Sequence, residues 1–194
     1  QRVRGTPDDP MMRQFGFLAA VIVALDAAGV TYMVTGSIAS THHAEPRMTR
    51  DIDIVIETDH VAVKLLVNQF DPTRFYVGNA QQAVADRDMF NVIDTTGGWK
   101  VDLIIRKARR FSEVELGRRQ HARIGEVDLY VATAEDTILS KLEWMRMGGS
   151  DRQLADVVAV LETQGPALDH DYMDRWAPDL GVENLLQQAR RLAE

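Results

Sequence analysis

Residues 32–57 of this 194-residue chain have the sequence YMVTGSIASTHHAEPRMTRDIDIVIE, and this stretch decides the fold. A short apolar run ends at Gly36-Ser37, and a second run, DIDIVI, begins at Asp51. Side chains alternate between the two faces of a strand, so Asp51 and Asp53 share one face while Ile52 and Ile54 point into a core. The pattern predicts two strands, residues 31–35 and 52–57, on either side of a segment of small residues.

The two aspartates of the second strand indicate a cation site. Aspartate is depleted in strands, and like charges on one face of a sheet repel each other. A cation between Asp51 and Asp53 would offset this cost, and Mg²⁺ commonly binds one or two carboxylates together with substrate phosphates. We therefore predict that this strand binds Mg²⁺.

The Gly36-Ser37 pair indicates an anion site. Glycine permits a tight turn after the first strand, and serine is a preferred residue at the N-cap of a helix. Backbone N–H groups and the positive end of the helix dipole would then face a bound anion. A phosphate-binding turn beside two metal-binding carboxylates is typical of a nucleotide site.

Together, Gly36-Ser37, a spacer and Asp51-Ile52-Asp53 resemble the nucleotidyltransferase signature of the DNA polymerase β-like superfamily. Residues 45–57, EPRMTRDIDIVIE, are more narrowly similar to the AbiEii-type nucleotidyltransferases, a family that includes toxins of bacterial toxin–antitoxin pairs. The resemblance extends to about Leu161. It implies an NTP-dependent, Mg²⁺-dependent enzyme that transfers a nucleoside monophosphate to an acceptor.

A third carboxylate, Asp102, lies in the apolar segment KVDLI and faces away from Val101 and Leu103. In the superfamily that the chain resembles, a third acid on the neighbouring strand completes the metal site. The resemblance therefore implies that Asp51, Asp53 and Asp102 are catalytic and bind Mg²⁺, and Asp102 is also a candidate base toward the acceptor hydroxyl. The alternative is an aspartate on a solvated sheet face or paired with Lys100.

Three further residues are expected at the nucleotide, beside Gly36 and Ser37. Lys141, in TAEDTILSKL, resembles a family lysine that reaches the phosphates; its alternative is a solvated helix residue. Asp156, in RQLADV, resembles a later family motif, although Gln153 stands where an aspartate is usual; its alternative is an i,i+4 pair with Arg152. Arg50 precedes the aspartate strand and either meets the triphosphate or offsets the local negative charge.

The rest of the pattern predicts an α+β fold. We expect a nucleotidyltransferase-like mixed β-sheet core flanked by helices in residues 1–132, and a helical C-terminal lobe in residues 133–194. Strand-like runs stop near Ala132, and beyond it apolar residues recur at helical spacing. Thr133, with Asp136 three residues later, forms a start that resembles a capping box.

Composition narrows the class of protein. A formal net charge of −7 disfavours a generally basic nucleic-acid-binding surface, and 45% apolar residues support a folded core. The absence of cysteine excludes disulfides and thiolate zinc sites and suits a reducing cytoplasm, where we expect the protein. No apolar run is long enough for a membrane span, so we expect no membrane partner.

The acceptor is open at this point. The resemblance implies RNA, tRNA or protein as acceptor and, for a toxin, a cognate antitoxin as partner. An RNA-modifying enzyme should have its basic residues bordering the site. In this chain the basic residues between the core and the lobe are Arg106, Lys107, Arg109, Arg110, Arg118, Arg119 and Arg123. One alternative is an aminoglycoside-type small-molecule nucleotidyltransferase, which should have an acidic acceptor cleft; another is a non-catalytic relative that binds a nucleotide or partner.

Overall fold

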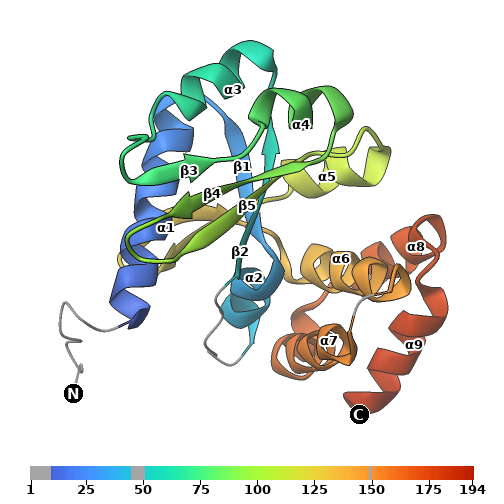
Figure 1. Cartoon of the computed structure of the whole chain (residues 1–194). Helices are drawn as coiled ribbons and strands as arrows, with labels where there is room; N and C mark the ends of the chain where they lie inside the picture. Colours follow the sequence, from blue (N-terminus) through green and yellow to red (C-terminus); the bar gives the residue numbers. More distant parts are fainter. Residues whose placement is uncertain (1–9, 45–50, 149) are drawn as a thin grey trace.

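The computed structural model describes residues 10–44, 51–148 and 150–194 (Figure 1). Within these segments the strands form a seven-stranded mixed sheet with the order β3-β4-β5-β2-β1-β7-β6. The strands are β1 (Thr31–Thr35), β2 (Asp51–Glu57), β3 (Phe75–Val77), β4 (Met89–Asp94), β5 (Lys100–Ile105), β6 (Gln120–Ile124) and β7 (Val127–Val131). This arrangement confirms the predicted mixed sheet flanked by helices.

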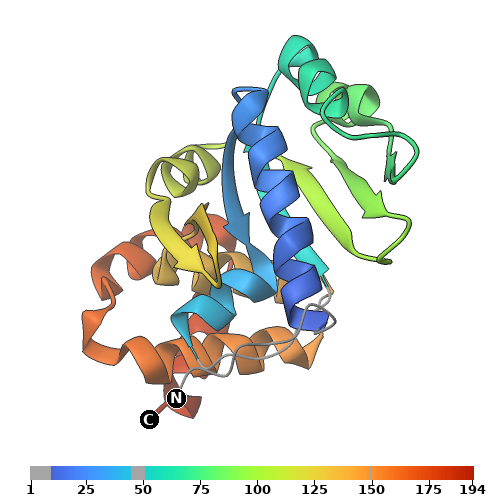
Figure 2. The ribbon, with the colours of Figure 1, turned by 90° about the vertical axis from the view of Figure 1, so that its left-hand side faces the viewer.

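Helices surround the sheet on both faces and extend beyond one end of it (Figures 1 and 2). They are α1 (Pro10–Ala27), α2 (Gly36–His43), α3 (His60–Val67), α4 (Ala80–Asp86), α5 (Arg110–Gly117), α6 (Ala134–Arg146), α7 (Asp151–Gln164), α8 (His170–Leu180) and α9 (Glu183–Leu192). None of these helices, within the segments described, has the length and apolarity needed to cross a bilayer.

The central strands place the acidic residues together. Strand β2 is antiparallel to β1 and parallel to β5, and in the parallel pair Asp53 lies directly beside Asp102. Neighbouring residues in register share a face of the sheet, so Asp51, Asp53 and Asp102 all project to the same side. On the opposite side, Ile52 and Ile54 are fully buried, as the alternating pattern predicted.

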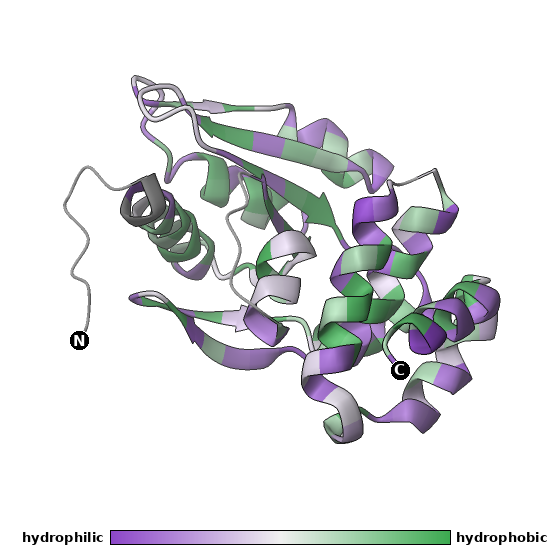
Figure 3. Cartoon of the chain, turned by 90° about the horizontal axis from the view of Figure 1, so that it is seen from below, coloured by the Kyte–Doolittle hydropathy of each residue, from purple (hydrophilic) through white to green (hydrophobic). Residues whose placement is uncertain are grey.

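Two apolar clusters stabilise the molecule. The first joins the sheet to α1, α3 and α4 and contains Leu25, Met33 and Leu103. The second fills the space between α6, α7, α8 and α9, and it also includes Phe111 of α5. Figure 3 shows both apolar regions from below, one along the strands and one within the helices near the C-terminus. The division into domains at residue 132 stays a prediction, and Phe111 packs with the helices beyond it.

Candidate functional site

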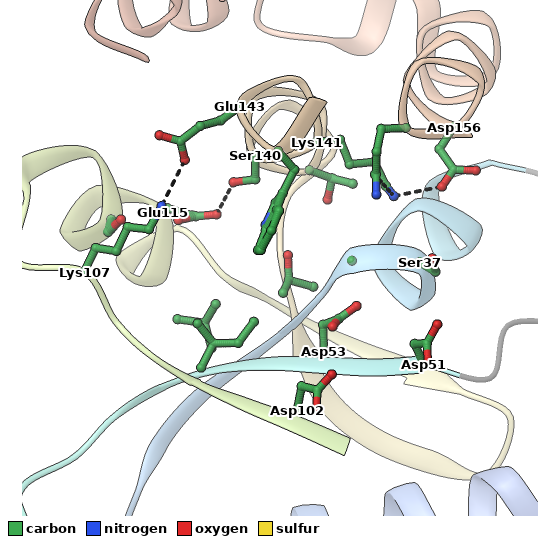
Figure 4. A pocket seen from close by; sticks show the side chains of 18 of the residues that line it. Ser37, Asp51, Asp53, Asp102, Lys107, Glu115, Ser140, Lys141, Glu143 and Asp156 are labelled. Carbon is green, nitrogen blue, oxygen red and sulfur yellow. Dashed lines mark hydrogen bonds and ion pairs between the residues drawn. The ribbon is translucent and has the colours of Figure 1, made fainter. Parts of the chain in front are cut away.

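A cavity of about 500 Å³ opens between the sheet and helices α5, α6 and α7. Its walls come from β1, α2, β2, β5 and the segment after β5 on one side, and from α6 and α7 on the other (Figure 4). The cavity brings together Gly36, Ser37, Asp51, Asp53, Asp102, Lys141 and Asp156, which the sequence singled out. Arg50, the remaining expected residue, lies outside the described residues.

Three carboxylates form the sheet side of the cavity. Asp102 is buried at 7% exposure, Asp53 is half-buried and Asp51 is exposed. Burial raises the pKa of Asp53 to about 6, and the negative charges of Asp102 and Asp51 act in the same direction. Lys141 and Lys100 counter this effect only in part. The site therefore concentrates negative charge where solvent is partly excluded.

Asp102 has one oxygen paired and one oxygen without a partner. The Lys100 ammonium donates to Oδ2 of Asp102 at 2.8 Å, so the alternative of a Lys100 pair is present. Oδ1 of the same carboxylate is buried and has no hydrogen-bond partner among the described residues. A buried polar atom left unsatisfied is unfavourable, and native sites of this kind usually meet a ligand, water or ion.

The described carboxylates do not form a ready-made metal-binding cluster. Among the residues that the structure describes, no group of three or more histidine, aspartate or glutamate side chains converges in a geometry able to hold a metal ion. The donor set nevertheless suits a hard cation, because it consists of carboxylate oxygens on one face. The unsatisfied Oδ1 of Asp102 is consistent with such a cation.

Gly36 makes the close approach between α2 and β2 possible. Its φ of +63° favours glycine, and a Cβ at this position would lie 2.1 Å from Oδ2 of Asp53. The predicted N-cap role of Ser37 is wrong, because the helix begins at Gly36 and its N-cap is Thr35, which makes no side-chain capping bond. Ser37 instead lies in the first turn of α2 and lines the cavity.

Lys141 reaches the cavity from α6. The residue is only 4% exposed, so the alternative of a solvated helix lysine is wrong. Its ammonium donates to Asp156 at 2.8 Å and to the Gln153 side-chain oxygen at 3.0 Å, both from α7. The glutamine therefore retains an acceptor oxygen at the position where the resembling family has an aspartate.

The cavity has a further group of residues that sequence reasoning missed. Glu115 of α5 is 5% exposed and accepts a hydrogen bond of 2.7 Å from Ser140. Burial raises the pKa of Glu115 to about 7, although the Ser140 bond opposes this shift. The sequence signal was the spacing, because Glu115 follows Phe111 by four residues and therefore shares its face on a helix. The structure shows that this face is buried.

Glu143 of α6 binds two basic side chains from the segment after β5. It accepts from both terminal nitrogens of Arg109, one of them at 2.7 Å, and from Lys107 at 3.4 Å. Burial raises the pKa of Glu143, but the bonds from Arg109 and Lys107 outweigh it and hold the pKa below its ordinary value. Glu143 is therefore a charged partner to both cations.

The basic segment, residues 106–123, borders the cavity only with its first residues. Arg106, Lys107 and Arg109 line the cavity, whereas Arg118 and Arg123 do not. Each of these five residues has a carboxylate partner in the structure. The pairs are Arg106 with Glu57, Lys107 and Arg109 with Glu143, Arg118 with Glu135 and Asp136, and Arg123 with Glu126.

Comparison with known proteins supports the fold. No protein-family profile and no curated protein matches the sequence. An antigenic nucleotidyltransferase-like protein from Paracoccidioides brasiliensis is similar in structure, with a TM-score of 0.54, 16% identity, and coverage of 92% of this chain and 93% of that chain. The AbiEii-type resemblance has no confirmation in these comparisons.

The antibiotic-resistance factor ANT(2'')-Ia is also similar. Its solution structure gives a TM-score of 0.60 at 10% identity, with 91% of this chain and 98% of that chain covered. Its complex with adenylyl-2''-tobramycin gives 0.60 at 12% identity, with 87% and 97% covered. At such identities the likeness concerns the fold alone. The chain therefore has a nucleotidyltransferase-like fold, with its acidic face, glycine turn and buried lysine around one cavity.

Proposed function

We propose that this protein is a nucleotidyltransferase that moves a nucleoside monophosphate from an NTP to an acceptor in a Mg²⁺-dependent reaction. One observation carries the proposal: Asp53 lies beside Asp102 in the sheet and against Gly36 of the next helix. In this arrangement two carboxylates that repel each other lie side by side, next to the start of a helix. Their repulsion is unfavourable unless a cation binds between them, and the helix start suits a phosphate.

The proposed chemistry assigns a role to each residue. Asp51, Asp53 and Asp102 would hold Mg²⁺, which supplies positive charge to the triphosphate and to the departing pyrophosphate. Ser37 and the first turn of α2 would bind the terminal phosphates through hydroxyl and backbone N–H groups. Lys141, oriented by Asp156, would add a fixed positive charge on the opposite wall.

Asp102 would also accept the proton of the attacking hydroxyl. No residue in the described part of the chain hydrogen-bonds to its Oδ1, so this oxygen has an acceptor position for an incoming donor. Lys100 would keep Oδ2 in place through the 2.8 Å hydrogen bond. An acceptor oxygen placed next to Oδ1 would lose its proton to this carboxylate as the bond to phosphorus forms.

The acceptor and the biological role remain part of the proposal. The AbiEii-type resemblance favours RNA, tRNA or protein as acceptor, and it favours a toxin with a cognate antitoxin, acting in the cytoplasm where NTPs are made. A second candidate is an aminoglycoside-type enzyme. It is favoured by the acidic residues Glu115 and Glu143 in the cavity and by the similar structure that contains adenylyl-2''-tobramycin.

The test is label transfer from each α-labelled NTP with Mg²⁺ and, in turn, total RNA, cell protein or tobramycin. We expect transfer by the wild type and none by Asp53→Asn. Asp128→Asn is the matched control, because Asp128 is an exposed β7 residue outside the cavity. The absence of both transfer and NTP binding in the wild type would leave the non-catalytic alternative in place.

A further inference from the structure

Ser140 and Glu115 form a hydroxyl–carboxyl pair inside the cavity. The Ser140 hydroxyl donates to Oε1 of Glu115 at 2.7 Å, and both residues line the cavity. A hydroxyl within hydrogen-bond reach of a base is the arrangement that activates an oxygen nucleophile. The proposed transfer to an external acceptor uses Asp102 as the base and gives neither residue of this pair a role.

The surroundings of Glu115 suit a proton acceptor. The residue is 5% exposed, and burial raises its pKa to about 7. A base is most effective when its pKa lies near the working pH, because it is then partly ionised and still binds a proton well. Arg109 attracts Glu115 electrostatically but makes its ion pair with Glu143. Glu115 can therefore take the Ser140 proton near neutral pH.

Ser140 lies next to the proposed position of the NTP. It immediately precedes Lys141 on α6, and both residues line the cavity wall that faces the aspartates. Lys141 is proposed to contact the terminal phosphates, so a bound NTP would also lie close to Ser140. Ser140 is half-buried, in contrast to Glu115, so a ligand in the cavity can contact it.

The direction of approach also fits a nucleophile. In phosphoryl transfer the attacking and leaving oxygens lie roughly in line with the phosphorus. With Ser37 and Lys141 at the terminal phosphates, pyrophosphate leaves toward these two residues. Figure 4 shows Ser140 and Glu115 on the side of the cavity away from Ser37. Ser140 therefore lies on the side from which a nucleophile must reach the α-phosphorus.

We propose that this protein nucleotidylates itself on Ser140, with Glu115 as the base. Oγ of Ser140 forms a bond to the α-phosphorus of the NTP, and the bond from that phosphorus to the oxygen of the β-phosphate breaks. Pyrophosphate leaves, and the hydroxyl proton passes to Glu115. This inference rests on the proposed function, because the NTP occupies the same site and the same aspartates hold its metal.

The product is a phosphodiester that keeps a nucleoside monophosphate inside the cavity. To move this group onward, an acceptor would have to attack in line with Ser140, from the side toward which pyrophosphate departed. That side is the proposed phosphate site rather than an entry for an acceptor. The modification is therefore an end product, and it blocks the binding of a further NTP.

The first test measures a gain of mass without any added acceptor. The wild type, Ser140→Ala and Thr137→Val are incubated with each NTP and Mg²⁺ and examined by intact-protein and peptide mass spectrometry. Thr137 is the matched control, because its buried hydroxyl belongs to a cavity-lining residue one turn before Ser140, and no described residue hydrogen-bonds to it. We expect one nucleoside monophosphate on Ser140 in the wild type and in Thr137→Val, and none in Ser140→Ala.

The second test separates a base from a structural partner. Glu115→Gln keeps an acceptor oxygen for the Ser140 hydroxyl but cannot take its proton. It should slow the modification by about 100-fold or more without a change in NTP affinity. Glu126→Gln, the control, removes a carboxylate whose pair with Arg123 lies outside the cavity, and it should react at the wild-type rate. Equal rates in Glu115→Gln and the wild type would overturn the role of Glu115.

A mixing experiment tests whether each molecule modifies its own serine. Asp53→Asn, which retains Ser140, is incubated with an affinity-tagged Ser140→Ala protein, which retains the aspartates. We expect no modification of either protein, because Ser140 lines the cavity of its own chain. Modification of the Asp53→Asn protein in the mixture would overturn the proposed geometry.

NTP binding is measured separately by titration calorimetry on Ser140→Ala and the wild type. The absence of NTP binding in both proteins would refute the proposed function and this inference with it. NTP binding by the wild type without a gain of mass would overturn the inference alone. The same holds if Ser140→Ala gains as much mass as the wild type, because the nucleotide would then be attached elsewhere.

Discussion

Gly36 and Asp53 approach each other so closely that a Cβ on residue 36 would lie 2.1 Å from the Asp53 carboxylate. This contact joins the start of α2 to the middle of the aspartate strand. The turn after β1 therefore needs glycine for two reasons. The φ of residue 36 is +63°, and the Asp53 carboxylate occupies the space that a Cβ would take.

Gly36→Ala should therefore displace Asp53 and abolish NTP binding. Gly29→Ala is the matched control, because Gly29 has a φ of +66° but no described residue has an atom within 4 Å of the added Cβ. Both variants should lose about 1–2 kcal/mol of unfolding free energy from the left-handed backbone conformation. Gly36→Ala alone should lose more unfolding free energy than this, as measured by urea unfolding. Gly36→Ala alone should also lose affinity for NTP, as measured by titration calorimetry. Equal behaviour of the two variants would contradict the contact.

Asp53→Asn should make the protein more stable and inactive. Asp53 is partly buried beside two other carboxylates, so its charge opposes folding near neutral pH. Removing it should raise the unfolding free energy in the presence of EDTA by about 1–3 kcal/mol. Mg²⁺ should then raise the melting temperature of the wild type but not of the variant. Asp51→Asn should stabilise less, since Asp51 is exposed, and a destabilised Asp53→Asn would refute this account.

The Lys141–Asp156 pair should couple the two helices that face the aspartates. Its atoms are 2.8 Å apart and both side chains are almost fully buried. Lys141→Met alone should cost about 3–5 kcal/mol, because it leaves a buried carboxylate without its cation. The double variant Lys141→Met with Asp156→Leu should recover most of this stability. Neither variant should bind NTP, and recovery of NTP affinity in the double variant would show that Lys141 serves stability alone.

Glu115 should give the protein a stability that depends on pH. Its pKa in the folded protein is raised from 4.5 to about 7, so the folded state binds the proton more tightly than the unfolded state. The stabilisation is fully present below about pH 4.5 and is lost as the pH rises through about 7. Over that window the unfolding free energy should fall by about 3 kcal/mol more in the wild type than in Glu115→Gln. Parallel pH profiles of the two proteins, measured by urea unfolding, would contradict the burial of an uncharged carboxyl group.

The local pattern of the sequence determined much of the secondary structure. Alternation in DIDIVI placed Ile52 and Ile54 in the core and the aspartates on the other face, and the structure agrees. Thr133 caps α6 by accepting from the Asp136 backbone, as expected. Such features depend on residues a few positions apart, so the sequence alone specifies them.

The start of α2 shows where local reasoning failed. Serine is a preferred N-cap, and this preference placed Ser37 at the cap. The helix instead begins at Gly36 and leaves Thr35 at the N-cap, and Gly36 itself has a positive φ. Gly36 there packs closely on Asp53 from another strand, a long-range contact that the local sequence does not report.

The partners of the site residues were decided by tertiary structure. Lys141 meets Asp156 of the next helix, Ser140 meets Glu115 of α5, and Glu143 meets Arg109. These contacts join residues 15 to 34 positions apart. They depend on how α5, α6 and α7 pack around Phe111 and the second apolar cluster. The sequence by itself determined the acidic strand and the glycine turn, because both arise from short-range pattern, whereas long-range packing decided which charges are buried, paired or open to a ligand.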